Sequence, residues 1–578
     1  MADFIPTRRY LNNSDAHIHH NIRIKRMSFS SVNTPPIIEI EKMFDQFYIF
    51  GAPPDITEHV DPVLLVTYPS TTNSSTQTNE ILNQLKSFSF PSGFHEINNE
   101  NNNTKKGKNQ KVSTHINNDQ ILLNEFVFYL SSNSKEKTYG ICVQFQIPST
   151  ASPFFCTHFS RKYPFCLCFL SKVPFLSSHF QFASYLALFL CGSQKSLKGQ
   201  GNDLHKPRIP IPVKGFCHSS LTLDKNFPAV AVLKGFSVPK LFFEELTFYH
   251  NLPVNPDISD MRSRAPIPLS NEMALCVPYH FTRNKCLAYP TFHAFFSALN
   301  PSAIVKIYTS LLLEQRILFV SQDLQLASFA VIASNSLISP LISQACIAPI
   351  LPDDERFQCI LQSPVPYVVG STTENENADV IVDLDNGSIS TNSDIPSLPE
   401  SELLIQKLEQ LISSSSESIL VPPKEVKSFF GAKSMNPAYD KFMDSTNVYV
   451  FPTVFTKYTP IKYILTPFII EDILTLFSEF FIPSVNERIA SCFVTDTTDP
   501  ENPITVLNKD LLMNIVPNEE KEFYSSFIAT QVFSEFCEKK ADEFSKSKLD
   551  NIEKSKKDFS HSISLPSFRK KDLPEKTV

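Results

Sequence analysis

The side chains that could do chemistry in this 578-residue chain do not fall into the spacing of any familiar catalytic motif. The sequence contains no G-x-x-x-x-G-K-[ST] loop to cradle phosphates and no G-x-G-x-x-G turn for a dinucleotide. It also lacks the G-x-S-x-G elbow that presents a nucleophilic serine and the H-E-x-x-H pair that binds catalytic zinc. The chain is therefore not a P-loop nucleotidase, and we expect it to have no active site of its own.

Two acidic residues near the middle of the chain have a spacing that suits a cation. Asp383 and Asp385 stand two apart, so that on a strand both would point to one face. The same residues also fit a turn, because Asp385-Asn386-Gly387 is a common way to end a strand. We favour the turn.

The cysteines and the N-terminal histidines do not form a recognisable metal site. No C-x-x-C pair occurs among the 12 cysteines, and Cys166 and Cys168 alternate as they would on one face of a strand. Free thiols buried in a reducing cytosol explain this distribution. His17, His19 and His20 lie in a polar stretch that we interpret as a tail. We therefore expect neither a bound metal nor a cofactor.

The composition limits the class of protein more than it defines it. The length exceeds what one hydrophobic core supports, and 42% hydrophobic residues suit globular domains, so we expect three or four domains. A formal net charge of −7 argues against a dedicated nucleic-acid-binding protein, which would carry a basic face. We see no secretory signal at the N-terminus, where no apolar stretch follows a basic start.

One segment, 173–191, contains no Asp, Glu, Lys or Arg and therefore resembles a membrane span. A spanning helix needs about 20 apolar residues. This segment also contains proline, serine, histidine and glutamine. We interpret it as a buried helix of a soluble domain.

Hydrophobic patterning predicts the elements that must position these side chains. In the middle of the chain, short apolar runs alternate with helical periodicity, which indicates an α/β layer with largely parallel strands. One helix starts near Pro301, where proline is favoured, and a second, apolar helix starts at Asp323. The predicted strands of this unit are 316–320, a strand approaching 350, 365–369 and 380–384.

Different patterns occur on either side of this unit. Upstream, alternating apolar residues predict a small, mostly antiparallel sheet backed by helices. Its predicted strands are 44–51, 62–69, a hairpin of 125–130 with 139–147, and 165–170. Downstream, apolar residues recur on a helical period in 468–480 and 523–536, which predicts a helical domain.

These patterns divide the chain into modules, linkers and tails. The insertion rich in Asn and Lys, and both ends of the chain, have the composition of disordered segments. The predicted order is a disordered tail at 1–40, an upstream α/β module at 41–195 with a disordered insertion at 98–118, a linker at 196–214, a central α/β module at 215–390, a helix and Ser-rich linker at 391–428, a helical module at 429–545 and a charged tail at 546–578.

Several strings along the chain resemble, in the same order, the three consecutive parts of the DENN family. Their ordered spacing carries the resemblance. The family often has Trp-Gln where this chain has Ser343-Gln344, and the Asn-rich insertion is unusual, but both departures leave the fold prediction intact. The strings are FDQFYIFG, PVLLVTYP, FSFPSG, YGICVQF and YPFCLCFLSKVPF upstream, LLLEQRIL, ILP, SPVPYVVG and DLD in the centre, and FIIEDILTLFSEFF and FYSSFIATQVFSEF downstream.

This resemblance implies both a fold and a function. The implied fold is α/β plus all-α, with a longin-like N-terminal module, a central DENN module and a helical C-terminal module. The implied function is guanine-nucleotide exchange on a Rab-type small GTPase in vesicle trafficking, by a cytoplasmic protein that is transiently at endomembranes. Exchange requires a binding surface and no cofactor. Membrane contact would be peripheral, through the basic residues of the charged tail.

The resemblance places the GTPase across the upstream and central modules, and four polar residues beside a central strand are our candidate contacts. They are Gln315, Arg316, Gln322 and Asp323. The first two also have a structural interpretation, because Glu314-Gln315-Arg316 could end a helix with Arg316 at the negative end of its dipole. Asp323 also has a structural interpretation, in which its sole role is to cap the helix that follows it.

Two rival functions are compatible with this fold. The first is a non-catalytic trafficking adaptor that binds a Rab GTPase as a scaffold. The second is a GTPase-activating protein, because distant longin-DENN relatives supply an arginine to the GTPase, and Arg161 is the candidate for that role here. Such an arginine can raise the hydrolysis rate about 10³- to 10⁵-fold. Arg161 has no recognisable motif around it and also fits a plain surface arginine.

Overall fold

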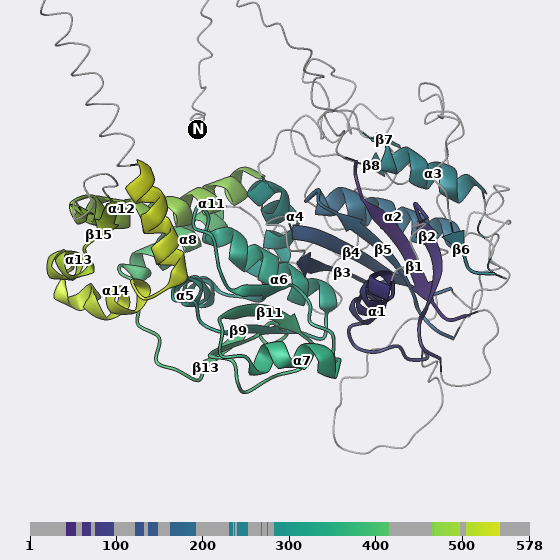
Figure 1. Cartoon of the computed structure of the whole chain (residues 1–578), viewed down its shortest axis with the longest axis horizontal. Helices are drawn as coiled ribbons and strands as arrows, with labels where there is room; N and C mark the ends of the chain where they lie inside the picture. The colour runs from purple at the N-terminus through teal and green to yellow at the C-terminus, as the bar shows by residue number, and fades with distance from the viewer. Residues whose placement is uncertain are drawn as a thin grey trace, which may run out of the picture. The chain divides into compact units, whose positions relative to one another are not determined.

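The computed structural model is a mixed α/β structure with two main sheets and helices around them (Figure 1). Several predicted segments lie outside the described residues, and so does Arg161. These segments are the tails at 1–40 and 546–578, the insertion at 98–118, the linker at 196–214 and the Ser-rich stretch at 415–428. The described residues are 42–53, 60–70, 76–97, 122–131, 137–147, 162–191, 231–252 apart from 235, 237 and 239, 267–268, 274–275, 283–414, 465–496 apart from 466, and 504–543.

The first sheet is antiparallel throughout and has six strands in the order β3-β4-β5-β1-β2-β6. The hairpin predicted upstream is confirmed, because its two strands pair directly with each other as β3 and β4. The strands are β1 (Gln46–Gly51), β2 (Val63–Tyr68), β3 (Leu122–Ser131), β4 (Lys137–Phe145), β5 (Phe165–Ser171) and β6 (Ala231–Val232).

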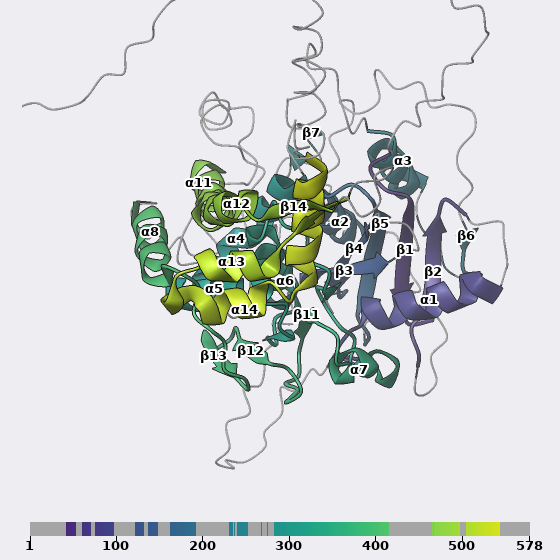
Figure 2. The ribbon, with the colours of Figure 1, turned by 60° about the vertical axis from the view of Figure 1, so that its left-hand side comes forward.

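Helices cover both faces of this sheet, so each strand has apolar residues on two sides. On one face, Phe88 of α1 (Thr76–Ser89) stacks on Phe128 with ring centroids 4.7 Å apart. Cys166 and Cys168 share that face, as their spacing predicted, and both are free and buried. The opposite face packs on α2 (Leu176–Leu190) (Figure 2). Many antiparallel sheets instead have one face in the core and one face in solvent, so that buried and exposed side chains alternate along each strand.

The apolar segment predicted as a buried helix is α2. Almost all of its side chains are buried against the first sheet and the helices beside it. Among the described helices, none combines the length and the hydropathy that crossing a bilayer requires. A helix that is apolar on all sides is therefore explained here by burial within the protein.

The second sheet has five strands in the order β10-β11-β9-β12-β13. Its first four strands are parallel, as predicted, and β13 is an antiparallel addition that the hydrophobic pattern did not suggest. The strands are β9 (Ile317–Val320), β10 (Cys346–Ala348), β11 (Tyr367–Ser371), β12 (Val380–Asp383) and β13 (Ser388–Thr391). Buried β-branched and aromatic side chains fill β9 and β11, as is usual for strands covered on both faces.

Two helices beside the second sheet begin where predicted, near Pro301 and at Asp323. Asn300 caps α5 (Pro301–Leu312) and Asp323 caps α6 (Leu324–Leu337), each through its side-chain oxygen. Hydrophobic patterning did not predict α7 (Glu355–Gln362), which Asp354 caps. The other helices and the short hairpin before α5 are α3 (Lys240–His250), α4 (Arg283–Ala298), β7 (Ile267–Pro268) and β8 (Ala274–Leu275).

The C-terminal part of the described chain consists mainly of helices and one hairpin, and it shares its core with α4 and α5. The helix predicted within 391–428 is confirmed; it begins at Ser401, directly after Glu400, which has a φ of 55°. The helix predicted over 523–536 is interrupted at 528–530. These elements are α8 (Ser401–Ser414), α11 (Pro467–Phe480), α12 (Ile482–Ala490), β14 (Phe493–Asp496), β15 (Ile504–Leu507), α13 (Lys509–Ile515), a 3-10 turn (Asn518–Glu520), α14 (Lys521–Phe527) and helical residues 531–543.

Candidate functional site

The loops that follow β9, β11 and β12 meet at the carboxyl edge of the parallel sheet. The Ser321 hydroxyl donates to Oδ1 of Asp385 at 2.6 Å, and the Gln322 amide N–H donates to Oδ2 of Asp385 at 3.0 Å. Nε2 of Gln322 donates to the carbonyl oxygen of Thr372 at 2.9 Å. These bonds tie three loops together while the side chain of Gln322 stays exposed. Ligands of parallel α/β sheets bind at this edge.

The acidic pair at this edge forms a turn. Oδ1 of Asp383 accepts the backbone N–H groups of Asp385 and Asn386, each at 3.0 Å. Gly387 follows with a φ of 66°, a conformation that favours glycine. Both carboxylates are engaged by N–H and O–H donors, and no group of three possible metal ligands occurs among the described residues.

Asp323 faces inward from the same edge. Its Oδ1 accepts the backbone N–H groups of Gln325 and Leu326 at 2.9 and 3.3 Å, and the residue is 5% exposed. A carboxylate at this position satisfies free N–H groups of the first helical turn and interacts favourably with the helix dipole. The structure therefore gives Asp323 the capping role that was its alternative interpretation.

The carboxyl edge also faces the first sheet, because α6 packs against the edge strand β3. Oε1 of Glu125, on β3, accepts the Ser184 hydroxyl at 2.5 Å, and Oε2 accepts Nε2 of Gln325 at 3.2 Å. Beside this pair, Leu324 and Ala327 of α6 pack in the same apolar cluster as β3 and α1. Covering β3 in this way removes an exposed strand edge.

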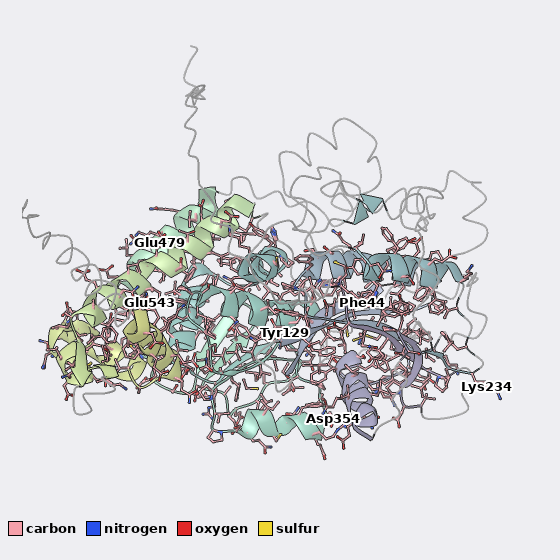
Figure 3. All side chains as sticks on the ribbon, turned by 45° about the horizontal axis from the view of Figure 1, so that its top comes forward. Phe44, Tyr129, Lys234, Asp354, Glu479 and Glu543 are labelled. Carbon is pink, nitrogen blue, oxygen red and sulfur yellow. The ribbon has the colours of Figure 1, made fainter. Side chains whose placement is uncertain are left out.

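A second contact joins the helix α1 of the first sheet to α7 of the second. The Ser87 hydroxyl donates to Oδ2 of Asp354 at 3.0 Å, and the rings of Phe88 and Phe357 are 5.0 Å apart. Figure 3 labels Asp354 where these two helices meet. We call the whole contact the seam, defined by Ser87, Phe88 and Glu125 on the first-sheet side and by Gln325, Asp354 and Phe357 on the second-sheet side.

An exposed cation stands at the outer rim of the seam. Arg356 of α7 donates to both oxygens of Asp354 and to the Ser87 hydroxyl, and its side chain is 56% exposed. The hydrogen bond from Arg356 holds the pKa of Asp354 well below its ordinary value, against the smaller opposing effect of burial. Asp354 therefore stays ionised, and the guanidinium is held in place at the surface.

The other two candidate contacts lie at the opposite, amino edge of the parallel sheet. Arg316 forms a two-pronged ion pair with Asp379, at 2.7 and 3.0 Å, and its backbone N–H donates to the same carboxylate. Burial alone would raise the pKa of Asp379, but the hydrogen bonds and charge of Arg316 outweigh it and lower that pKa. Arg316 follows the C-terminal end of α5, as its structural interpretation assumed, and its charge is paired with Asp379. Gln315 is half-buried, and its Nε2 donates to the carbonyl of Leu313 at 3.2 Å.

Glu314, the residue before this pair, anchors the helix at 531–543. Its two carboxylate oxygens accept the backbone N–H groups of Gln531 and Val532 at 2.8 and 3.0 Å. Close by, Nε2 of Gln344 donates to Oε2 of Glu535 at 2.7 Å. The amino edge of the sheet is thus the attachment point of the C-terminal helices, whereas the carboxyl edge is the attachment point of the first sheet.

The four predicted contact residues consequently do not form one site. Gln315 and Arg316 precede β9, and Gln322 and Asp323 follow it, so the two pairs are about 20 Å apart along the strand direction. Gln322 is the exposed member of the four. Sequence reasoning missed Arg356 and the rest of α7, although an aspartate directly before Glu355 is a recognisable N-cap signal.

Comparisons with known proteins match the chain to two related domains. The DENN (AEX-3) domain matches residues 252–387, and the uDENN domain matches residues 62–145. DENN domain-containing protein 1B from Homo sapiens is 23% identical over 321 residues, which is 54% of this chain and 31% of that protein. Elicitor of plant defense protein 1 is 32% identical over 113 residues in Gibberella zeae and 30% identical over 113 residues in Fusarium odoratissimum, covering 18% of this chain and 10% and 12% of those proteins. The chain therefore spans no more than 31% of the length of any of these three relatives.

Proposed function

This chain belongs to the DENN domain family, and from that premise we propose that it is a guanine-nucleotide exchange factor for a Rab-type small GTPase. The observation that carries the proposal is the match of the uDENN and DENN domains, in that order, to ranges that contain β2–β4 of the first sheet and β9–β12 of the second. The proposed modules are 41–195, 215–390 and a helical module at 429–545.

Exchange requires only that the protein bind the nucleotide-free GTPase more tightly than the nucleotide-bound form. Nucleotide and exchange factor then weaken each other's binding by the same factor, so the exchange factor speeds GDP release. The switch loops of a small GTPase hold Mg²⁺ and the phosphates, and displacing them is the proposed route. A rigid surface made by two modules can do this without a cofactor.

We place the docking surface along the rim of the seam. Gln322 supplies an exposed amide at the carboxyl edge, and Arg356 supplies an exposed cation held by Asp354. The other three candidate residues would affect GTPase binding only by holding the surface in shape. Each of Gln315, Arg316 and Asp323 is half-buried or buried and is hydrogen-bonded to a neighbouring part of the chain.

The test is release of labelled GDP from a panel of Rab proteins, with and without the full chain. We expect acceleration on one or two members. Gln322→Ala and Arg356→Ala should each lower the exchange rate at least about tenfold, the cost of one well-placed polar contact at an interface. Gln406→Ala is the matched control, because Gln406 is an exposed glutamine on α8, away from the seam.

Two outcomes would overturn exchange as the function. Binding to a Rab protein without faster GDP release would establish an adaptor. Faster GTP hydrolysis that is lost in Arg161→Ala would establish a GTPase-activating protein. The proposed location is the cytoplasm, with transient recruitment to endomembranes. If the basic tail makes a peripheral membrane contact, deleting 546–578 should abolish binding to vesicles.

A further inference from the structure

Among the described seam residues, Glu125 is the carboxylate that is fully buried, whereas Asp354 is partly exposed at the rim. Glu125 lies on the edge strand β3 between residues that pack into two different apolar clusters, and it is 1% exposed. Its two oxygens accept from different elements: Ser184 belongs to α2, beside the first sheet, and Gln325 belongs to α6, beside the second. Glu125 therefore links the two sheets from within.

Stability alone does not explain a carboxylate at this place. Removing a carboxylate from water costs several kcal/mol, and well-packed apolar residues in place of a buried polar group are often as stable or more so. A fixed buried carboxylate instead penalises alternative placements of α6, because a shifted α6 would remove the hydrogen bond from Gln325 to its buried Oε2. Its physical effect is to select one position of α6 against β3.

That position sets where the exposed part of the carboxyl edge lies. Gln325 is in the first turn of α6, three residues after Gln322, so the two move together. Fixing Gln325 against Glu125 therefore fixes the Gln322 loop relative to β3 and to the α1 helix on the same sheet. Without this link, apolar contacts such as those of Leu324 and Ala327 would hold α6 with weaker directional preference.

We infer that Glu125 is a positioning residue that aligns the two halves of the docking surface across the seam. This inference rests on the proposed function only for its effect on exchange. The alignment itself is a property of the chain and can be measured without a GTPase.

The decisive comparison is between an apolar and a polar replacement of the pair. Glu125→Leu with Gln325→Leu should fold with a melting temperature at or above that of either single variant, yet lower kcat/KM for exchange at least about tenfold. Glu125→Gln as a single substitution should keep exchange at the wild-type level. Its amide oxygen can accept from Ser184, and its NH₂ group can donate to Oε1 of Gln325 after rotation. That oxygen is buried and has no hydrogen-bond partner within the described structure. A stable double-leucine variant with undiminished exchange would overturn the inference, as would a Glu125→Gln variant as defective as the double-leucine variant.

A distance measurement separates this inference from the proposed function. Spin labels at Gln84 on α1 and Gln362 on α7, both exposed, report the placement of one sheet against the other in a background whose other reactive cysteines are serine. The distance distribution should be broader in the double-leucine variant than in the wild-type protein, and in Glu125→Gln it should be as narrow as in the wild-type protein. An unchanged distribution would refute the positioning role. Absence of exchange by the wild-type protein, with the expected broadening present, would refute the exchange function alone.

Discussion

Glu314 and Glu400 form a natural matched pair for measuring what a carboxylate contributes to holding the C-terminal helix. Both are glutamates in the left-handed region, with φ of 51° and 55°. The Glu314 carboxylate accepts two N–H groups at the start of the helix at 531–543. Glu400 is exposed, and within the described part of the chain no hydrogen bond to its carboxylate is seen. We predict that Glu314→Gly destabilises that helix, whereas Glu400→Gly is nearly neutral.

The magnitude follows by difference, because the backbone effects are common to both variants. Glycine relieves about 1 kcal/mol or more of left-handed strain, and it costs roughly 0.5–1 kcal/mol through the greater freedom of the unfolded chain. The side-chain effect is specific to Glu314. A helix cap contributes about 0.5–2 kcal/mol and a carboxylate at the positive end of the helix dipole about 0.3–1 kcal/mol. We therefore expect Glu314→Gly to be less stable than Glu400→Gly by about 2 kcal/mol.

Amide hydrogen exchange of peptides that cover 531–543 is the suitable assay, because it reports local opening of that helix in a multidomain chain. A difference of about 2 kcal/mol predicts roughly 30-fold faster exchange in Glu314→Gly than in Glu400→Gly. Glu314→Gln should lie between them, because it keeps one acceptor oxygen and loses the charge. Equal exchange in the two glycine variants, within about threefold, would refute the claim that the Glu314 carboxylate anchors the helix.

Three further predictions concern the cores and their charges. Gly370→Ala should destabilise the chain by at least about 3 kcal/mol in denaturant unfolding, because a Cβ there would overlap the backbone carbonyl of Pro349; the nearest atoms to a Cβ in Gly140→Ala belong to the side-chain ring of Phe128, which can rotate, and this variant should cost less. Asp379→Asn should lower stability at neutral pH and flatten its decline below about pH 4, because a carboxyl whose pKa is lowered on folding stabilises above its ordinary pKa and loses that effect as the pH falls. An unaltered acid profile in Asp379→Asn would contradict the role of the ion pair. Burial lowers the pKa of His179 from 6.5 to about 4, so between these pH values the unfolded chain binds a proton that the folded chain does not. The melting temperature should therefore drop as the pH falls from about 6.5 to 4. The drop should be shallower in His179→Gln.

Local patterning predicted the elements whose residues are nearly all buried or nearly all alternate. Strands β9 and β11 follow from short apolar runs between turn residues, and α5 follows from its proline and its helical spacing. Some of the missed elements have no strong apolar period. Helix α7 has eight residues of which one is buried, and the β14–β15 hairpin exposes the cross-strand pair Val494 and Val506. Such elements are stabilised by a few tertiary contacts that a linear pattern does not contain.

The candidate site was predictable in its residues and not in its geometry. Adjacency to a strand suggested that Arg316 and Gln322 lie together, but a strand carries its two flanking residues to opposite edges of the sheet. The partners of these residues are also remote in sequence. Arg316 pairs with Asp379, 63 positions away, and Glu314 bonds to Gln531, 217 positions away. Hydrophobic periodicity carries no information on such pairs.

The same geometry limits what the family strings can say about a partner. In LLLEQRIL the leucines are buried, Glu314 anchors a helix and Arg316 closes an ion pair. In SPVPYVVG the residues from Tyr367 to Gly370 are buried, and in FYSSFIATQVFSEF the aromatic residues fill the C-terminal core. These strings therefore specify how the parts of the chain are packed and joined, and they expose few side chains to a partner. Under the proposed function, selectivity would come from exposed residues outside these strings. Exchanging Gln322 and Arg356 for the residues of a relative should then change the preferred GTPase without changing stability, whereas exchanging residues within the strings should change stability first.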